Sequence, residues 1–221
     1  MKIYHFVYTQ PGPRPFVPGA IMDYYCATLD DRIAEDKFNV FSGHLLYNTL
    51  TVYDKNLDDE VAKDVMHFAY YTHDVPEDAD DLVVAVLTQN PTAATDTLIF
   101  EACQCDTPKS LRMLLQLLPH AKIQTRCLRE AARWEHMDNV GVLLEDGRVK
   151  DDGSALAAAC DGGNRAIFER LLAVADPQIA LELYPPQKNK IWLEEIVQAQ
   201  HQKQKLTEAV TDGLSPRTRK I

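Results

Sequence analysis

ALAAACDGGNRAIFERLLAVAD, residues 155–176, is the stretch of sequence that decides the fold. Its first part is rich in alanine, the pair Gly162-Gly163 interrupts it, and its second part carries the pair Leu171-Leu172. Alanine and leucine favour a helix, whereas glycine is unfavourable inside one. The stretch therefore predicts two short helices joined by a tight turn. The next question is whether this hairpin stands alone.

The same pattern occurs twice more, earlier in the chain. Each unit has a leading leucine, an alanine three or four positions later and a closing leucine pair. These residues are Leu98, Ala102 and Leu114-Leu115; Leu128, Ala131 and Leu143-Leu144; and Leu156, Ala159 and Leu171-Leu172. The leading leucines are 30 and then 28 residues apart. A fixed period in this range is typical of a solenoid, so we interpret the hairpin as one unit of an array.

The unit resembles the ankyrin repeat. In DGSALAAACDGGN, residues 152–164, Ser154-Ala155-Leu156 stands where Thr-Pro-Leu is usual, and Gly163-Asn164 where Gly-His is usual. LREAARWEHMDNVGVLLEDG, residues 128–147, matches in its Leu-x-x-Ala-Ala and its closing Leu-Leu-x-x-Gly. The period is shorter than the roughly 33 residues of the family, and Thr107-Pro108 replaces the usual break in the first unit. The resemblance covers about residues 96–176. It implies an array with short or missing fingers between its units.

We therefore expect a mainly α fold, in which an ankyrin-like solenoid of helical hairpins joins a small N-terminal α+β element and a C-terminal capping helix. The expected segments are an N-terminal element or cap at 1–55, repeats at 56–186, the capping helix at 187–213 and a disordered basic tail at 214–221. The expected repeats are a degenerate one at 56–92, with Met66, Ala69 and Leu82-Val83 in place, and three more at 96–122, 125–150 and 152–176.

The N-terminal segment does not fit the repeat. Alternation of Tyr4, Phe6 and Tyr8 with His5 and Val7 predicts a strand. The proline-rich run QPGPRPFVPG, residues 10–19, excludes a regular helix or a central strand there. VPGAIMDYYCATLDDRIAED, residues 17–36, predicts a helix, and VFSGHLLYNTLTVYD, residues 40–54, predicts one or two strands. The apolar stripe of the predicted helix contains Ile21, Tyr25, Leu29 and Ile33.

The C-terminal segment predicts a helix that covers the last repeat. Asp176-Pro177 is a favourable N-cap and first-turn pair for a preceding helix, and Pro185-Pro186 separates the two helices. In IWLEEIVQAQHQKQKLTEAV, residues 191–210, apolar residues lie near one face. They are Trp192, Ile196, Ala199, Leu206 and Val210. Because terminal units of a solenoid must shield an apolar face from water, we expect this face to be buried.

The charge disfavours several classes of partner. The formal net charge is −10, which repels nucleic acid and anionic membrane surfaces. It is uneven: residues 54–81 hold ten acids and two lysines, whereas residues 188–221 have a net charge of +3. No apolar run is long enough for a transmembrane helix, and MKIYHFVYTQPG lacks the apolar core of a secretory signal. We expect a soluble monomer that is cytoplasmic, or exported without a cleaved signal peptide.

The sequence contains no pattern typical of a metal, cofactor or nucleotide site. The five cysteines are an odd number, and Cys103, Ala132 and Cys160 occupy equivalent places in the three units, which favours a packing role. His67 and His73 are six residues apart, so they do not share a helix face. The nucleophile elbow, the P-loop and G-x-G-x-x-G are all missing. We expect no metal and no cofactor.

The first functional hypothesis is a non-enzymatic module for protein–protein interaction, such as a microbial effector or adaptor. In ankyrin-like arrays the concave partner surface uses the first helix of each unit and the turn before it. The resemblance therefore implies that Arg129, Arg133 and Trp134 contact a protein partner. His136 lies with Trp134 at the break between the helices of the central unit. The alternative role for Trp134 is packing between units.

Two other hypotheses remain open. The chain would be an enzyme if its N-terminal segment, at 1–55 or extending to 90, carried the chemistry in a cleft. The candidate catalytic residues of that cleft are Tyr4, His5, His44 and Tyr47. The chain would be an acidic inhibitor, similar to an antitoxin, if its stretch at 54–81 occupied a basic site on another protein.

Overall fold

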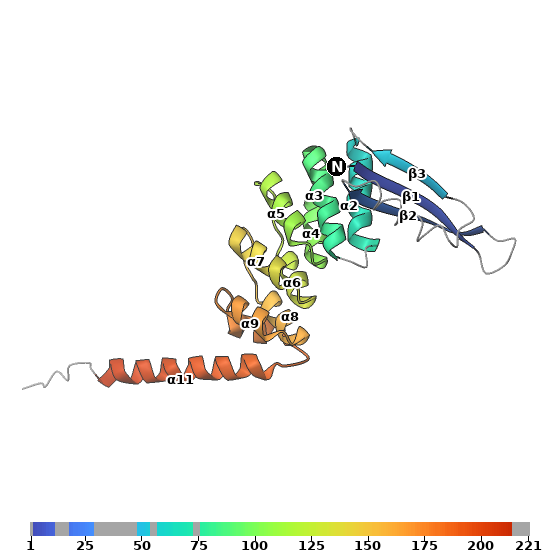
Figure 1. The fold of residues 1–221 in the computed structure, drawn as a ribbon. Helices are drawn as coiled ribbons and strands as arrows, with labels where there is room; N and C mark the ends of the chain where they lie inside the picture. The colour runs from blue at the N-terminus through green and yellow to red at the C-terminus, as the bar shows by residue number, and fades with distance from the viewer. Residues whose placement is uncertain (1, 12–17, 29–47, 54–56, 73–75, 214–221) are drawn as a thin grey trace, which may run out of the picture. The chain divides into compact units, whose positions relative to one another are not determined.

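The computed structural model describes residues 2–11, 18–28, 48–53, 57–72 and 76–213. These residues are mainly helical, which confirms the predicted class, and Figure 1 shows the order of the elements. The chain divides into two compact units. The first contains residues 1–123 and 141–148, and the second contains residues 124–140 and 149–221. Each unit is described by itself below.

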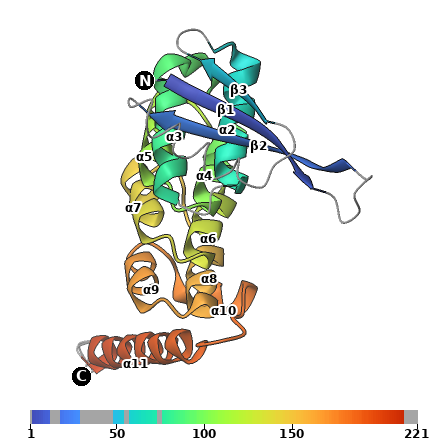
Figure 2. The same cartoon turned by 45° about the vertical axis from the view of Figure 1, so that its right-hand side comes forward.

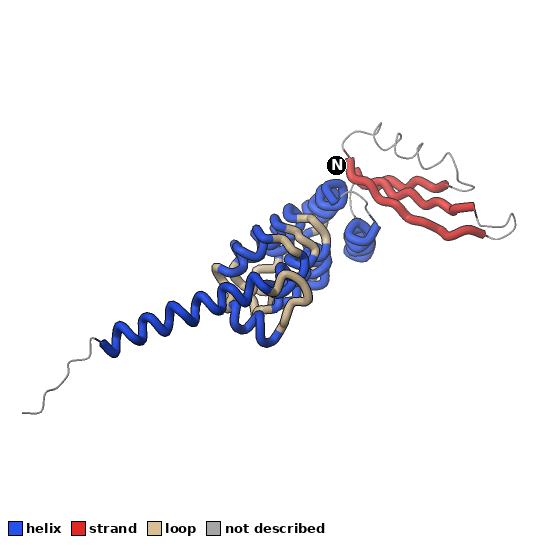
Figure 3. The backbone as a smooth tube through the Cα atoms, turned by 90° about the horizontal axis from the view of Figure 1, so that it is seen from below, coloured by secondary structure: helices blue, strands red, loops and turns tan. Residues whose placement is uncertain are grey.

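The first unit begins with an antiparallel sheet of strand order β2-β1-β3, whose three strands run side by side in Figure 3. The strands are β1 (Lys2–Pro11), β2 (Pro18–Thr28) and β3 (Asn48–Tyr53). In the central strand, His5 is opposite Tyr25 of β2 and Thr51 of β3. The predicted strand around Tyr4, Phe6 and Tyr8 is confirmed, and so is a strand within residues 40–54.

The helix predicted over 17–36 is wrong for residues 18–28, which form β2. Ile21 and Tyr25 have helical spacing, but this segment is also rich in β-branched and aromatic residues, which fit a strand. Pairing with β1 decides between the two, because it satisfies the backbone groups of both strands. Leu29 and Ile33, which completed the predicted stripe, lie outside the described residues.

Two helical hairpins complete most of the first unit. Their helices are α2 (Asp59–Thr72), α3 (Pro76–Gln89), α4 (Asp96–Gln104) and α5 (Pro108–Leu117), and the short 3-10 helix η1 (Pro91–Ala93) joins the pairs. The first helix of one pair packs on the first helix of the next, α2 on α4, and the second on the second, α3 on α5. Strand β2 contacts both α2 and α3. The sheet therefore lies against the first helical pair.

Side chains from neighbouring elements satisfy the ends of α5. Asp80 of α3 accepts hydrogen bonds from the backbone N–H groups of Lys109 (2.9 Å) and Ser110 (2.6 Å) in the first turn of α5. At the other end, the Arg148 guanidinium donates to the carbonyls of Leu115 (2.9 Å) and Leu118 (2.6 Å). These are backbone groups that a helix cannot satisfy by itself.

The second unit contains the later helices. They are α6 (Thr125–Arg133), the first part of α7 (Met137–Asp146), α8 (Ser154–Gly162), α9 (Arg165–Leu172), α10 (Pro177–Leu183) and α11 (Ile191–Gly213). Helix α6 packs on α8, and α9 packs beside α8, as Figure 2 shows. Asp151 caps α8 by accepting from the N–H groups of Ala155 and Leu156, both at 3.0 Å. Asn164 is the N-cap of α9, and its side chain accepts from the N–H group of Ile167 at 3.1 Å.

The residues that repeat in the sequence are buried. The three leading leucines and the three alanines are inaccessible to solvent, and the first leucine of each closing pair is fully buried. In the earliest helical pair, Met66, Ala69, Leu82 and Val83 are buried too. In these helical pairs, the spacing of the apolar residues therefore identified buried positions correctly.

The predicted helix over 191–210 is confirmed as α11, but the prediction that its whole apolar face is buried is wrong. Leu193 and Val197 are buried, and Trp192 is half-buried. Leu206 is 68% exposed, Val210 is 62% exposed, and Ala199 is exposed. A helix of 23 residues is about 34 Å long, whereas α9 has only eight residues. The short helices before α11 therefore cover only its first turns. Among the described residues, no helix is both long and apolar enough to cross a membrane.

Candidate partner-binding groove

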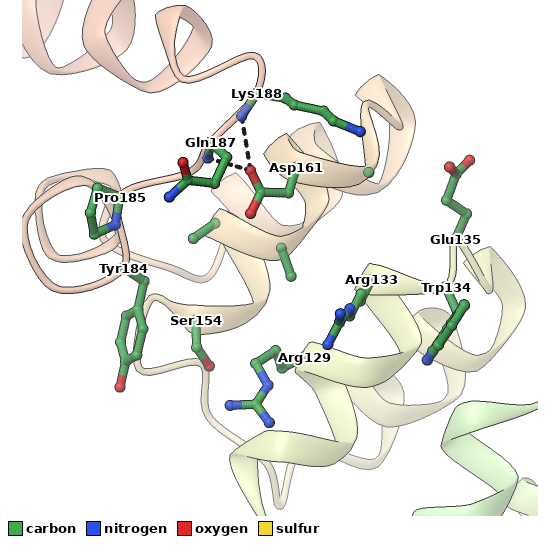
Figure 4. A pocket seen from close by; sticks show the side chains of 13 residues that line it. Arg129, Arg133, Trp134, Glu135, Ser154, Asp161, Tyr184, Pro185, Gln187 and Lys188 are labelled. Carbon is green, nitrogen blue, oxygen red and sulfur yellow. Dashed lines mark hydrogen bonds between the residues drawn. The ribbon is translucent and has the colours of Figure 1, made fainter.

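A groove of about 1140 Å³ lies in the second unit, between α6, α8 and the segment after α10 (Figure 4). One side is formed by the end of α6, with Arg129, Arg133, Trp134 and Glu135. The floor belongs to α8, with Ser154, Ala157, Ala158, Asp161 and Gly162. The other side is formed by Tyr184, Pro185, Gln187 and Lys188. Below, "the groove" means the space lined by these residues.

Small side chains make the floor of the groove. Ala157 and Ala158 are adjacent on α8, Gly162 follows Ala158 by four residues, and none of the three side chains extends beyond a methyl group. A Cβ atom added at Gly162 would meet its nearest neighbours, the carbonyl oxygen of Arg133 and Cγ of Glu135, at 3.7 Å, which is an ordinary contact. Because the side chains on the floor are small, a ligand backbone can come close to the backbone of α8.

Trp134 is the aromatic residue on the α6 side, and it is 56% exposed. It is the C-terminal cap of α6, and its N–H group donates to the carbonyl of Glu130 at 3.0 Å. The next residue, Glu135, has a left-handed φ of 63°, and His136 N–H donates to Ala131 O at 2.9 Å. This tight turn directs Trp134 into solvent. Within the second unit, most of the Trp134 side chain therefore stays accessible to solvent.

Two arginines share the α6 face beside Trp134, because positions four apart lie together on a helix. Arg129 donates to Oε1 of Glu130 from Nε (3.2 Å) and from Nη2 (3.0 Å). Glu130 is only 8% exposed, so this pair holds the guanidinium in place. The guanidinium carbon of Arg133 lies 5.9 Å from the centroid of the Trp134 ring, within the range of a cation–π contact.

The opposite side is fixed to α8 by hydrogen bonds. Asp161 Oδ1 accepts from the backbone N–H groups of Gln187 (2.5 Å) and Lys188 (3.0 Å), as Figure 4 shows. The Asn189 side chain donates to the carbonyl of Cys160 at 2.9 Å. Tyr184 is held more loosely, with its hydroxyl 3.4 Å from Asp152 Oδ2. The segment after α10 is therefore a defined wall and not a loose connection.

The structure brings together three of the four residues predicted to bind a partner. Arg129, Arg133 and Trp134 line the groove, whereas His136 is half-buried and does not line it. Sequence reasoning missed the wall formed by Tyr184, Pro185 and Lys188. The sequence does contain an aromatic–proline run, Tyr184-Pro185-Pro186, but nothing in it indicates that this run reaches α8.

Only two of the four candidate catalytic residues, Tyr4 and His5, lie among the described residues. Tyr4 and His5 are consecutive residues of β1. His44 and Tyr47 lie outside the described residues, as does His73. His67 Nδ1 lies 2.7 Å from Glu101 Oε2, which gives that histidine a structural contact within the first unit.

Four cysteines of the helical part are in environments that suit packing. Cys103, Cys127 and Cys160 are buried, and Cys105 Sγ donates to the Tyr70 carbonyl at 3.1 Å. Burial raises the pKa of the Cys105 thiol to about 11 and the pKa of Cys160 to about 12. Such thiols are protonated at neutral pH, and the thiolate is the form that binds metals. Within the described ranges, no group of three or more His, Cys, Asp or Glu residues is arranged to hold a metal ion.

The charge differs between the two units. The sequence of the second unit has thirteen basic and thirteen acidic residues, so the net charge of −10 belongs to the residues of the first unit.

Comparison of the chain with models of known protein families, with curated proteins and with solved structures finds no match. Function is therefore argued from the groove itself.

Proposed function

We propose that this protein is a non-enzymatic interaction module that binds a protein partner in the groove, and so acts as an adaptor or effector. One observation carries the proposal. Trp134 is 56% exposed at the end of α6, beside Arg129 and Arg133 and next to a floor of small residues. Tryptophan and arginine are enriched among the residues that contribute most to protein–protein binding. A bound partner would bury the indole ring of Trp134 and so remove it from water.

The arrangement of helices supports the same proposal. Helices α2 and α4 pack together in the first unit, and α6 and α8 pack together in the second. In each case these are the first helices of successive pairs, as expected for an ankyrin-like array. Such arrays present first helices along one surface, and the groove lies on first helices α6 and α8. We propose that the helical pairs form a divergent array of this kind.

The acidic stretch at 54–81 has structural contacts that reduce the case for an inhibitor. Asp80 caps α5, and Asp81 forms an ion pair with Lys109 at 2.7 Å. Asp58 accepts from the N–H group of Val61, and Asp59 accepts from the Thr92 hydroxyl. These contacts within the chain account for several of the acids without a basic site on another protein. We therefore do not propose an inhibitor.

The test uses capture followed by reconstitution. Immobilised full-length protein and its Trp134→Ala variant are each used to isolate binding proteins, which are identified by mass spectrometry. Each candidate is then purified, and its Kd is measured against both chains by calorimetry. We expect Trp134→Ala to weaken binding of the true partner by at least about 2 kcal/mol, as for a residue central to an interface.

A matched control separates the groove from exposed apolar surface in general. Leu206 is more exposed than Trp134 and lies on α11, outside the groove. Leu206→Ala should leave the Kd unchanged. Equal loss in both variants, or no loss in Trp134→Ala with any purified candidate, would reject the groove as the binding site.

A further inference from the structure

We infer that the partner presents an extended acidic segment, whose carboxylates meet Arg133 and Lys188 on opposite sides of the groove. This inference rests on the proposed function and names the chemistry of the partner. It starts from an imbalance among the charged residues that line the groove.

The acidic residues of the groove already have hydrogen-bond donors from this chain. Asp161 Oδ1 accepts from two backbone N–H groups, of Gln187 and Lys188. Glu135 Oε2 accepts from the Asn164 side chain at 3.3 Å. These bonds hold both carboxylates in place. The acids therefore have donors within the chain, although each keeps its negative charge.

The basic residues differ from the acids in this respect. Arg129 is held by Glu130, but within the described residues no ion pair involves Arg133 or Lys188. The Arg133 guanidinium lies over the face of the Trp134 ring. Figure 4 shows Arg129 and Arg133 on one side of the floor and Lys188 near Asp161 on the other. A ligand that supplies acceptors to both sides completes the groove.

The shape of the groove favours an extended ligand backbone. The floor includes the small residues Ala157, Ala158 and Gly162, so the backbone of an extended segment can lie close to α8. An extended chain rises about 3.3 Å per residue and alternates its side chains. Two acidic side chains an odd number of residues apart can therefore reach Arg133 and Lys188 on opposite sides of the groove, and apolar side chains of the same segment can meet Trp134 and Tyr184.

Other anionic ligands fit less well. A nucleic acid carries a dense line of phosphates, whereas the groove offers only Arg133 and Lys188 as basic side chains without an ion pair among the described residues. The acidic stretch of a second copy of this chain is partly folded in α2 and α3 and partly used in hydrogen bonds. Both remain as outcomes of the test below.

The test uses the full chain and a defined probe. A library of fluorescent synthetic peptides places glutamate and leucine at all relative spacings, and a matched library has glutamine in place of each glutamate. Binding is followed by fluorescence anisotropy. We expect a subset of glutamate peptides to bind, with a preference for two glutamates an odd number of residues apart, which point to opposite sides of an extended chain. Their glutamine counterparts should bind at least about tenfold more weakly. Raising the salt to about 0.5 M should weaken binding further.

Charge reversal locates the binding site. Arg133→Glu and Lys188→Glu should each weaken the best peptide by about tenfold or more. Lys205→Glu is the matched control, because it makes the same change in net charge on an exposed residue of α11 outside the groove. It should leave the affinity within about twofold. Arg133→Gln and Lys188→Gln, with thermal unfolding of every variant, separate loss of binding from loss of folding.

Several results would overturn the inference. They are the absence of any binder in the glutamate library, equal binding of the glutamine library, an effect of Lys205→Glu as large as that of Arg133→Glu, and tighter binding of single-stranded DNA than of any peptide. Concentration-dependent self-association that Arg133→Glu abolishes would assign the groove to a second copy instead. If Trp134→Ala abolishes binding of the captured partner while both charge reversals leave it intact, the interaction module stands and its acidic specificity fails.

Discussion

The indole ring of Trp192 in α11 packs against the ring of Phe168 in α9, with the ring centroids 5.4 Å apart and the planes tilted by 57°. The guanidinium carbon of Arg165 lies 5.1 Å from the centroid of each ring. Phe168 is fully buried, and Leu193 and Val197 of α11 are buried too. These contacts attach α11 to the rest of the second unit through its first two turns.

Trp192→Ala should therefore destabilise the second unit. Truncating a half-buried aromatic residue that packs on a buried ring should lower the free energy of unfolding by about 2 kcal/mol. Urea unfolding and hydrogen exchange would measure this loss, with the exchange effect concentrated in α9 and the start of α11. Leu206→Ala truncates an exposed apolar side chain of the same helix and should change neither measurement. Equal effects of the two variants would mean that the far end of α11 packs on something.

Ala159 and its neighbour Ala158 predict opposite outcomes for the same substitution. Ala159 is completely buried in α8, so Ala159→Leu should overpack the core and cost about 1–3 kcal/mol in stability. Ala158 is partly exposed and lines the groove. Ala158→Leu should change the unfolding midpoint little but raise the floor of the groove and weaken partner binding. Denaturant midpoints and Kd values for both variants give the comparison. An unchanged midpoint for Ala159→Leu would contradict the packing described here.

The helical hairpins could be predicted from the sequence because their determinants are local. Alanine-rich stretches, the Gly162-Gly163 break and the buried leucines all act within a few residues of each other. Strand β2 could not be, since Ile21 and Tyr25 fit both a helix and a strand. Its conformation is decided by pairing with β1, and such pairing is not visible in a local pattern. The spacing of Leu206 and Val210 likewise indicates an apolar face, but not whether anything covers it.

One side of the groove could be predicted and the other could not. Arg129, Arg133 and Trp134 are at the end of a predicted first helix, where the resemblance places partner contacts. The opposite wall depends on Asp161, whose carboxylate binds N–H groups 26 and 27 residues later in the chain. No spacing rule connects an acid in one helix with the backbone of a segment so distant. Sequence reasoning found the helix end, and the structure adds the wall that makes it a groove.

Arg148 joins the end of α5 to Asp146, and its loss should have a defined pH dependence. The hydrogen bond from Arg148 holds the pKa of Asp146 below its ordinary value. A carboxylate with a lowered pKa stabilises the fold above its unfolded pKa, and this contribution is lost as the pH falls through the folded pKa. Arg148→Gln should therefore cost about 1–3 kcal/mol at neutral pH. The difference from the wild type should shrink below about pH 4.

The difference should not vanish in acid, because the bonds from Arg148 to the carbonyls of Leu115 and Leu118 do not titrate. Arg112→Gln is the control in the same unit. It breaks the pair of Arg112 with Glu145, which is exposed at both side chains and should contribute little. Urea unfolding at several pH values gives the measurement. A stability difference for Arg148→Gln that stays constant from neutral pH to pH 3 would contradict the role of Asp146.

Gly153 and Gly147 both have left-handed backbone conformations, with φ of 92° and 74°, but their surroundings differ. A Cβ atom at Gly153 would lie 2.9 Å from the backbone nitrogen of Ala180 and 3.0 Å from its Cα, whereas a Cβ atom at Gly147 would have no neighbour within 4 Å. Gly147→Ala should therefore cost only the left-handed strain of about 1–2 kcal/mol. Gly153→Ala should lower the free energy of unfolding by more, because the start of α8 must also separate from α10.

The separation would reach the groove, since α10 leads directly into Tyr184 and the wall after it. We expect Gly153→Ala to lower both the unfolding midpoint and the affinity for the partner, and Gly147→Ala to lower the midpoint alone. Thermal unfolding and the Kd of each variant, measured on the same preparations, would show the difference. Equal midpoints with unchanged affinities would mean that α10 does not depend on its close approach to Gly153.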